Sequence, residues 1–412
     1  MRIRRSLAAP FLAAAITAGT SPHTARADTV TDWNQTAIEV MKVAGTPNNP
    51  WSRAMAMMHV AMSDAINATQ PRYARYLTSV ASRPAASEDA AAAAAARQIL
   101  IQLFPGQKAL ADKAFASSVE KIAEGAAKSE GIALGEQSAA AVMADRAGDG
   151  TSAPDTYRPV TRPGVWVPTT LPVFAQYAQA KPWVMTRADQ FRPGPPPRLS
   201  SAIYARDYNE TKSLGALNSA TRTAEQTEAV KFWTQTNFGP AWQAAARQLS
   251  AAKGLNLADN ARLFALLNMG IANTFIADWD AKFAHNFWRP MTAIRNGDRD
   301  DNPATVRDAG WTPLNATPMH PEYPSQAAIV TGVAVGVLES VFGPKPAVPF
   351  TFADLADPKQ TRTYQSLDAM AAEHTNVRVW GGIHFRNSLN VGEAMGRRIA
   401  AYMVNASLRP VR

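Results

Sequence analysis

The sequence of 412 residues contains no cysteine. Disulfide bridges, cysteine-ligated metal sites and thiol nucleophiles are therefore excluded. Charged residues are also scarce, at 18%, whereas hydrophobic residues make up 46% of the chain. A chain with this balance can bury a sizeable core, which argues against global disorder.

Beyond residue 27, no apolar run reaches the length of about 20 residues that spans a bilayer, so we expect no membrane span. Residues 1–27 differ from the rest of the chain, because four arginines and no acid accompany an apolar stretch and an Ala25-Arg26-Ala27 sequence. This order is typical of a secretory signal peptide cleaved near Ala27. We therefore predict export to the periplasm or the extracellular space; a disordered basic N-terminus is the alternative.

The positive charge is moderate. The formal net charge is +9, and removing the four arginines of residues 1–27 leaves 9 − 4 = +5. Basic and aromatic residues are not interleaved in the way that favours nucleic acid. The charge therefore suits acidic small molecules as ligands, and no nucleic-acid partner is expected.

No convincing alternation of apolar and polar residues occurs, so the fold class is predicted to be all-α. Apolar residues recur at helical spacing instead. The longest such stretch ends at Lys282. The predicted helices cover residues 33–43, 51–67, 87–104, 107–124, 128–146, 199–216, 223–233, 241–249, 257–282, 325–342, 359–379 and 389–406.

Residues 148–198 form a proline-rich segment. Ten prolines exclude long helices there, and several tryptophan, tyrosine and phenylalanine residues argue against a solvated linker. We expect a long ordered loop that lies across the helical body. It serves either as a wall over a functional site or as plain cover for the core.

Three short blocks carry the chemistry of the sequence. The first contains Lys282 and Arg289, the second places Ser325 at a predicted helix start, and the third contains Arg378 and His384. Arginine and lysine groups neutralise a multiply charged anion, and a helix start adds N–H donors. Histidine can act as a nucleophile or as a metal ligand. The set suits a bound tetrahedral oxyanion.

The order Lys-x6-Arg-Pro, Pro-Ser and Arg-x5-His resembles the signature of the vanadium-dependent haloperoxidase and type 2 phosphatidic acid phosphatase superfamily. Flanking sequences such as His320 to Ser325 and Trp380 to Phe385 resemble its bacterial haloperoxidase-like branch. The resemblance implies an all-α helical bundle of the vanadium haloperoxidase/acid phosphatase type with long Pro-rich loops. Residues 28–412 would form a single helical domain, with 255–406 as the anion-site core.

The resemblance also implies roles for individual residues. Lys282 and His384 would be catalytic, and His384 would bind vanadium or attack phosphorus. The oxygens of vanadate, or of phosphate in a phosphatase, would be held by Lys282, Arg289, Ser325, the Gln326 N–H and Arg378.

The sequence departs from the superfamily pattern at three positions. Ala327 stands where a histidine usually transfers protons, Gln326 replaces a glycine, and Ser388 replaces an acid that orients the last histidine. General acid–base catalysis contributes about 10²–10⁴-fold, or roughly 3–5 kcal/mol. His285, His320 and Glu322 could supply a replacement base, although structural roles are favoured for each, and His374 is a weaker candidate.

Three functions therefore stay open. The first is a haloperoxidase-like enzyme that oxidises bromide or iodide, rather than chloride, with hydrogen peroxide at a bound vanadate. The second is a phosphohydrolase that cleaves a phosphate ester with His384 as nucleophile. The third is an anion-binding protein whose catalysis is degraded because of Ala327. The sequence does not predict an oligomeric state.

Overall fold

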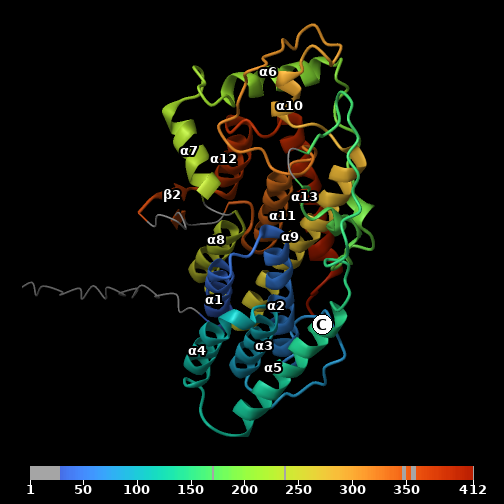
Figure 1. The fold of residues 1–412 in the computed structure, drawn as a ribbon. Helices are drawn as coiled ribbons and strands as arrows, with labels where there is room; N and C mark the ends of the chain where they lie inside the picture. The colour runs from blue at the N-terminus through green and yellow to red at the C-terminus, as the bar shows by residue number, and fades with distance from the viewer. Residues whose placement is uncertain (1–27, 169–170, 236–237, 346–348, 354–358, 412) are drawn as a thin grey trace, which may run out of the picture.

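The computed structural model describes residues 28–411 except 169–170, 236–237, 346–348 and 354–358. These residues form a helix-rich fold with one two-stranded sheet, which confirms the predicted all-α class (Figure 1). The α-helices are α1 (Thr29–Val43), α2 (Asn48–Thr69), α3 (Glu88–Leu103), α4 (Lys108–Val119), α5 (Ala126–Asp145), α6 (Ala202–Leu214), α7 (Ala224–Gln235), α8 (Phe238–Lys253), α9 (Leu257–His285), α10 (Pro290–Arg295), α11 (Gln326–Phe342), α12 (Leu367–Trp380) and α13 (Arg386–Ala406). Short 3₁₀ helices are η1 (Pro105–Gln107), η2 (Ala175–Gln179) and η3 (Ala188–Phe191).

Helices α2, α3 and α5 pack together at one end of the molecule (Figure 1). The alanine run of α3 is buried and begins after the cap formed by Ser87, whose hydroxyl accepts from Ala90 N at 3.2 Å. A Cβ atom on Gly131 of α5 would lie 2.9 Å from the Ala90 Cβ. Small side chains on both helices therefore set a short distance between them.

Helices α11 and α13 make a second close contact, next to α9 (Figure 1). A Cβ atom on Gly332 would lie 2.9 Å from Arg397 N, and one on Gly336 would lie 2.6 Å from the Ala400 Cβ. These two glycines of α11 therefore allow α13 to approach closely. Gly396 faces Gly332, so the two backbones meet directly.

Replacing Gly396 by alanine is expected to destabilise the fold by about 1–3 kcal/mol, because overpacked side chains force backbone shifts. The added Cβ would lie 2.8 Å from Val333 N. Thermal unfolding followed by circular dichroism measures the effect. Gly106→Ala is the matched control, since a Cβ there meets nothing within 4 Å. Equal midpoints for the two variants would contradict the prediction.

The sheet corrects the sequence prediction between residues 343 and 379. Strands β1 (Phe350–Ala353) and β2 (Thr361–Tyr364) pair antiparallel, with Phe350 opposite Tyr364, inside a region expected to be loop and helix. Helix α12 begins only at Leu367, after the Ser366 cap. The apolar side chains of the strands pack against Trp233, and four residues per strand gave too short an alternation to recognise.

The proline-rich segment lies along α9, as expected of an ordered covering loop (Figure 1). Val165 pairs with Phe287 in an isolated antiparallel bridge, and Trp166 is buried. The guanidinium of Arg192 donates to both carboxylate oxygens of Asp280 on α9, at 2.7 and 2.6 Å. These contacts fix the segment beside the end of α9 that carries Lys282.

The predicted signal peptide, residues 1–27, lies outside the described residues. In the part of the chain that the structure describes, no helix combines the length and hydropathy needed to cross a bilayer.

Candidate active site

The first block of the sequence lies where α9 ends. The helix begins after Asn256, whose side chain caps it, and ends at Asn286, which adopts a left-handed conformation with φ of 48°. Asparagine tolerates this conformation better than most residues because its short polar side chain bonds locally. The turn places Lys282 in the last turn of α9 and Arg289 immediately before α10.

The Lys282 ammonium group is fully buried and binds the loop that precedes α11. It donates to the carbonyl oxygens of Pro321 at 3.0 Å and Glu322 at 3.2 Å, and also to that of Pro324. Asp278, one turn earlier on α9, lies 3.6 Å away as its counterion. Lys282 therefore uses its protons to hold the loop that carries the second block.

Arg289 connects the first block to the third. One terminal nitrogen donates to Ile383 O at 2.8 Å and lies 3.1 Å from His384 Nε2. The other lies 3.0 Å from His320 Nδ1, and Nε donates to His320 O at 2.9 Å. The guanidinium has donors only, so both imidazole nitrogens must offer lone pairs to it. Arg289 thus lies between two neutral histidines.

Arg378 is held in the same manner from the last turn of α12. One terminal nitrogen lies 3.0 Å from His374 Nε2, and His374 Nδ1 lies 2.7 Å from the Thr331 hydroxyl. That hydroxyl donates to Ala327 O at 2.8 Å, so the proton between Thr331 and His374 belongs to the histidine. Arg378 therefore contacts a neutral imidazole that α11 orients.

His384 follows a helix end that glycine makes possible. Gly382 has φ of +76°, and its backbone approaches Gly215 O so closely that a Cβ would lie 2.5 Å from that oxygen. His384 is buried, its Nδ1 lies 2.8 Å from Glu322 Oε1, and its Nε2 faces Arg289. The third block therefore meets the other two at this imidazole.

Ser325 precedes the first residue of α11, where backbone N–H groups have no partner within the helix. Its buried hydroxyl has no hydrogen-bond partner in the described structure. Gln326 finds room for its side chain by donating to Asp278 Oδ2 at 3.3 Å. Ala327 lies in the first turn of α11. Because its side chain is a methyl group, this position contributes no titratable group.

Burial and charge act together on the titratable groups of the cluster. Burial, and then the positive charges of Arg289 and Lys282, lowers the pKa of His384 well below its usual value. Burial lowers the pKa of Arg378 to about 10, at which it stays protonated at neutral pH. Burial raises the pKa of Glu322, while Arg289 opposes that shift. As a result, the cluster contains neutral imidazoles beside charged arginines.

These residues fit a tetrahedral oxyanion. Lys282, Arg289 and Arg378 are all buried cations, and two further buried donor atoms, the Ser325 hydroxyl and Arg378 Nε, have no hydrogen-bond partner in the described structure. Unpartnered buried donors cost free energy unless an acceptor reaches them. An oxyanion would supply such acceptors, and it would also compensate the excess of positive charge.

The other histidines predicted near the site lie in two different places. His320 joins the cluster, since it contacts Arg289, is partly exposed, and its ring lies tilted by 35° against that of Trp279 at 4.9 Å between centroids. His285 contacts the proline-rich segment through Pro193 O at 3.0 Å and the ring of Tyr323 at 5.3 Å. A proton-transfer role of His285 stays a prediction.

Sequence reasoning missed how the cluster is supported. Glu322 was considered only as a base, but it contacts His384, and Ser388 lies beside the Glu322 carbonyl at 3.4 Å. Because the usual acid is missing at position 388, the sequence indicated that another carboxylate must orient His384. The role of Thr331 had no such signal, because threonine is common on buried helices.

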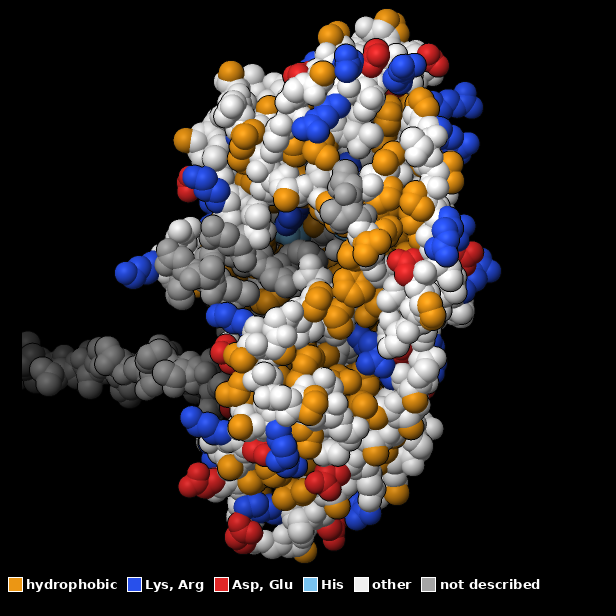
Figure 2. Space-filling view, in the orientation of Figure 1, with side chains coloured by type: hydrophobic (Ala, Val, Ile, Leu, Met, Phe, Trp, Pro, Cys, Tyr) orange, Lys and Arg blue, Asp and Glu red, His pale blue; other side chains and the backbone are white. Residues whose placement is uncertain are grey.

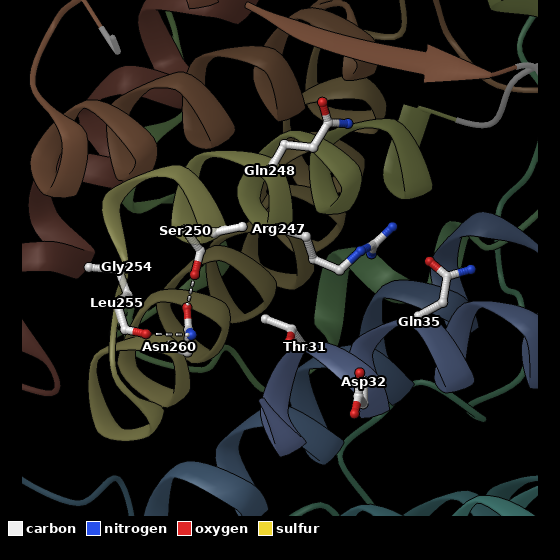
Figure 3. A pocket seen from close by; sticks show the side chains of 10 residues that line it. Thr31, Asp32, Gln35, Arg247, Gln248, Ser250, Gly254, Leu255 and Asn260 are labelled. Carbon is white, nitrogen blue, oxygen red and sulfur yellow. Dashed lines mark hydrogen bonds between the residues drawn. The ribbon is translucent and has the colours of Figure 1, made fainter. Parts of the chain in front are cut away.

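A separate pocket of about 330 Å³ lies between α1, α8 and the start of α9 (Figure 3). Its polar side chains bond largely to one another and to nearby residues. The Ser250 hydroxyl donates to Asn260, and Asn260 donates to Asp28 at 2.7 Å. None of the residues of the three blocks lines it.

Part of the chain matches a known family and a known protein. Residues 262–412 match the family model of the VCPO second helical-bundle domain. Vanadium chloroperoxidase from Curvularia inaequalis is 27% identical over an alignment of 182 residues, and the match covers 36% of this chain and only 29% of that protein.

Two solved structures resemble the chain over most of its length. The first bacterial vanadium-dependent iodoperoxidase has a TM-score of 0.78 at 23% identity, covering 93% of this chain and 98% of that one. A holo-type bacterial vanadium-dependent chloroperoxidase has a TM-score of 0.69 at 16% identity, covering 94% of each chain. Residues 262–412 thus resemble the VCPO second helical-bundle domain, and the chain as a whole has the fold of these bacterial vanadium-dependent haloperoxidases.

Proposed function

We propose that this protein is a haloperoxidase-like enzyme that binds vanadate at the cluster of Arg289, Ser325, Arg378 and His384. The observation that supports the proposal is that Arg289 of the first block lies 3.1 Å from His384 of the third, while the Ser325 hydroxyl and Arg378 Nε are buried donors without a partner in the described structure. The superfamily relationship supports the same assignment.

In this proposal Arg289 and Arg378 release the imidazole nitrogens that they now contact and donate to the anion instead. The Ser325 hydroxyl and the Gln326 N–H donate from the start of α11. Lys282 acts from behind, through its charge and through the loop that it holds. His384 presents Nε2, the nitrogen that bears the lone pair.

Bound vanadate would supply a Lewis-acid centre at which hydrogen peroxide becomes an oxidant of halide. We propose bromide or iodide as the halide, since Ala327 offers no group for proton transfer and since the chain resembles a bacterial iodoperoxidase. Of the remaining histidines, His320 is the proposed proton carrier. It contacts Arg289 and is partly exposed, so it can exchange protons with solvent.

We propose that small ions enter through a hollow of the molecular surface. Figure 2 shows a recess near the middle of one face, with basic and histidine side chains visible at its floor. Hydrogen peroxide and halide ions are small enough to enter such a recess.

The test compares purified protein with and without vanadate in a halogenation assay that uses a phenolic dye and hydrogen peroxide. We expect activity only after loading with vanadate, with iodide or bromide and with chloride lowest. Removal of vanadate by a chelator should abolish it. Hydrolysis of an aryl phosphate without vanadate is measured in parallel. Phosphate release without halogenation would assign a phosphohydrolase, and tight anion binding with neither activity would assign a binding protein.

A further inference from the structure

We propose that Glu322 is the positioning residue that aims His384 at the bound anion, in place of the acid that the superfamily pattern puts at the position of Ser388. The inference rests on the proposed function, because it concerns the same site. It assigns to the second block a role that the sequence pattern places in the third.

Glu322 contacts His384 directly, and a second hydrogen bond holds its carboxylate in place. Glu322 is fully buried, and its Oε1 lies 2.8 Å from His384 Nδ1. The same oxygen accepts the N–H of Phe385 at 2.9 Å, which fixes the carboxylate against the backbone beside the imidazole. Because two neighbouring groups bind one oxygen, the ring of His384 has little freedom to turn about its axis.

The contact of Arg289 with the His384 ring determines which ring nitrogen carries the proton. Arg289 faces Nε2 at 3.1 Å and can only donate, so Nε2 bears the lone pair. The proton of the neutral imidazole must then be on Nδ1, where it donates to Glu322. The pair therefore presents Nε2, which is the ring nitrogen that faces away from the carboxylate. Partners of this kind typically fix both the tautomer and the orientation of a ligating histidine.

Glu322 is itself held in place by other residues of the site. Lys282 donates to the carbonyls on both sides of it and to its own carbonyl, so the loop cannot shift without breaking buried bonds. The Ser388 hydroxyl reaches the Glu322 carbonyl at 3.4 Å. Position 388 therefore supports the backbone of the acid instead of supplying one, which explains the departure from the superfamily pattern.

The chain offers a matched control. Asp207 is a buried carboxylate that accepts the N–H of Asn387 at 2.7 Å, as Glu322 accepts that of Phe385. Both acids therefore bind the backbone where α13 begins, but only Glu322 also binds the imidazole. Comparing Glu322 variants with Asp207→Asn separates the effect on His384 from a general effect on α13.

The experiment measures affinity for vanadate, and for inorganic phosphate, in wild type, Glu322→Gln, Glu322→Ala and Asp207→Asn. Glu322→Ala should weaken vanadate binding by about 10–100-fold. Glu322→Gln, which keeps the size and an acceptor oxygen, should lose less. Asp207→Asn should stay within about 3-fold of wild type, because Asp207 binds the backbone at the start of α13 and does not bind the imidazole of His384. Thermal midpoints identify any variant that fails to fold.

Proton NMR supplies a readout that needs neither halide nor peroxide. The Nδ1 proton of His384, protected by the carboxylate, should give a slowly exchanging downfield resonance in wild type and Asp207→Asn that Glu322→Ala lacks. Retention of this resonance in Glu322→Ala, or vanadate affinity in both Glu322 variants equal to wild type, would overturn the inference. A wild-type protein with the resonance but without halide oxidation would instead refute the proposed function alone.

Discussion

Replacing His384 by alanine is expected to abolish vanadate-dependent halide oxidation, with a loss on the order of 10³-fold or more, as for removal of a central catalytic group. The imidazole is buried where the three blocks meet and presents Nε2 beside Arg289.

The measurement pairs the halogenation assay with the affinity for phosphate. His384→Ala should still bind phosphate within about 10-fold of wild type, because the arginines and Ser325 stay in place and charge dominates the binding of such anions. Retained phosphate binding with lost halogenation would show that the variant is folded and has lost the vanadium ligand. Halogenation at the wild-type rate would refute the assignment of His384.

Replacing Arg289 by alanine is expected to lower the affinity for vanadate or phosphate by about 10–10²-fold, because a hydrogen bond to a charged group contributes about 1.5–3 kcal/mol. Arg289 is buried, and burial lowers its pKa to about 10, so it is charged at neutral pH. Its loss would also leave the Nε2 of His384 and the Nδ1 of His320 without their common donor.

Equilibrium binding of each anion, measured by calorimetry, tests this expectation. Arg289→Lys keeps the charge but cannot bind two imidazoles at once, so its affinity should be intermediate. Arg187→Ala is the control, because that side chain is 73% exposed and pairs with Asp189 on the surface. Equal affinities for Arg289→Ala and Arg187→Ala would show that the anion binds elsewhere.

The sequence predicted most helices because their apolar residues repeat at helical spacing, and α9, α11 and α13 begin and end within a few residues of expectation. The hairpin of β1 and β2 escaped notice because its strands are stabilised by an aromatic contact with Trp233 from a distant helix. A short strand of this kind depends on tertiary packing more than on its own pattern.

At the site, the sequence identified candidate residues but not the residues that they contact. Arg378 and His384 could be identified from their Arg-x5-His spacing in the sequence. The contacts that orient them come from Thr331, His374 and Glu322, and Glu322 lies 62 positions from His384 along the chain. No local pattern links residues so far apart, so only the folded chain shows these pairs.

The close glycine contact between α11 and α13 would fix the geometry of the proposed anion site. Ser325 stands at the start of α11 and His384 stands just before α13, and Ser325 N also donates to Ser388 O at 3.2 Å. Because backbone meets backbone along this helix pair, the span between hydroxyl and imidazole cannot widen by rotamer changes. Anions of different size would then be accommodated by movement of the long arginine side chains. The fixed spacing of Ser325 and His384 would discriminate among anions of equal charge.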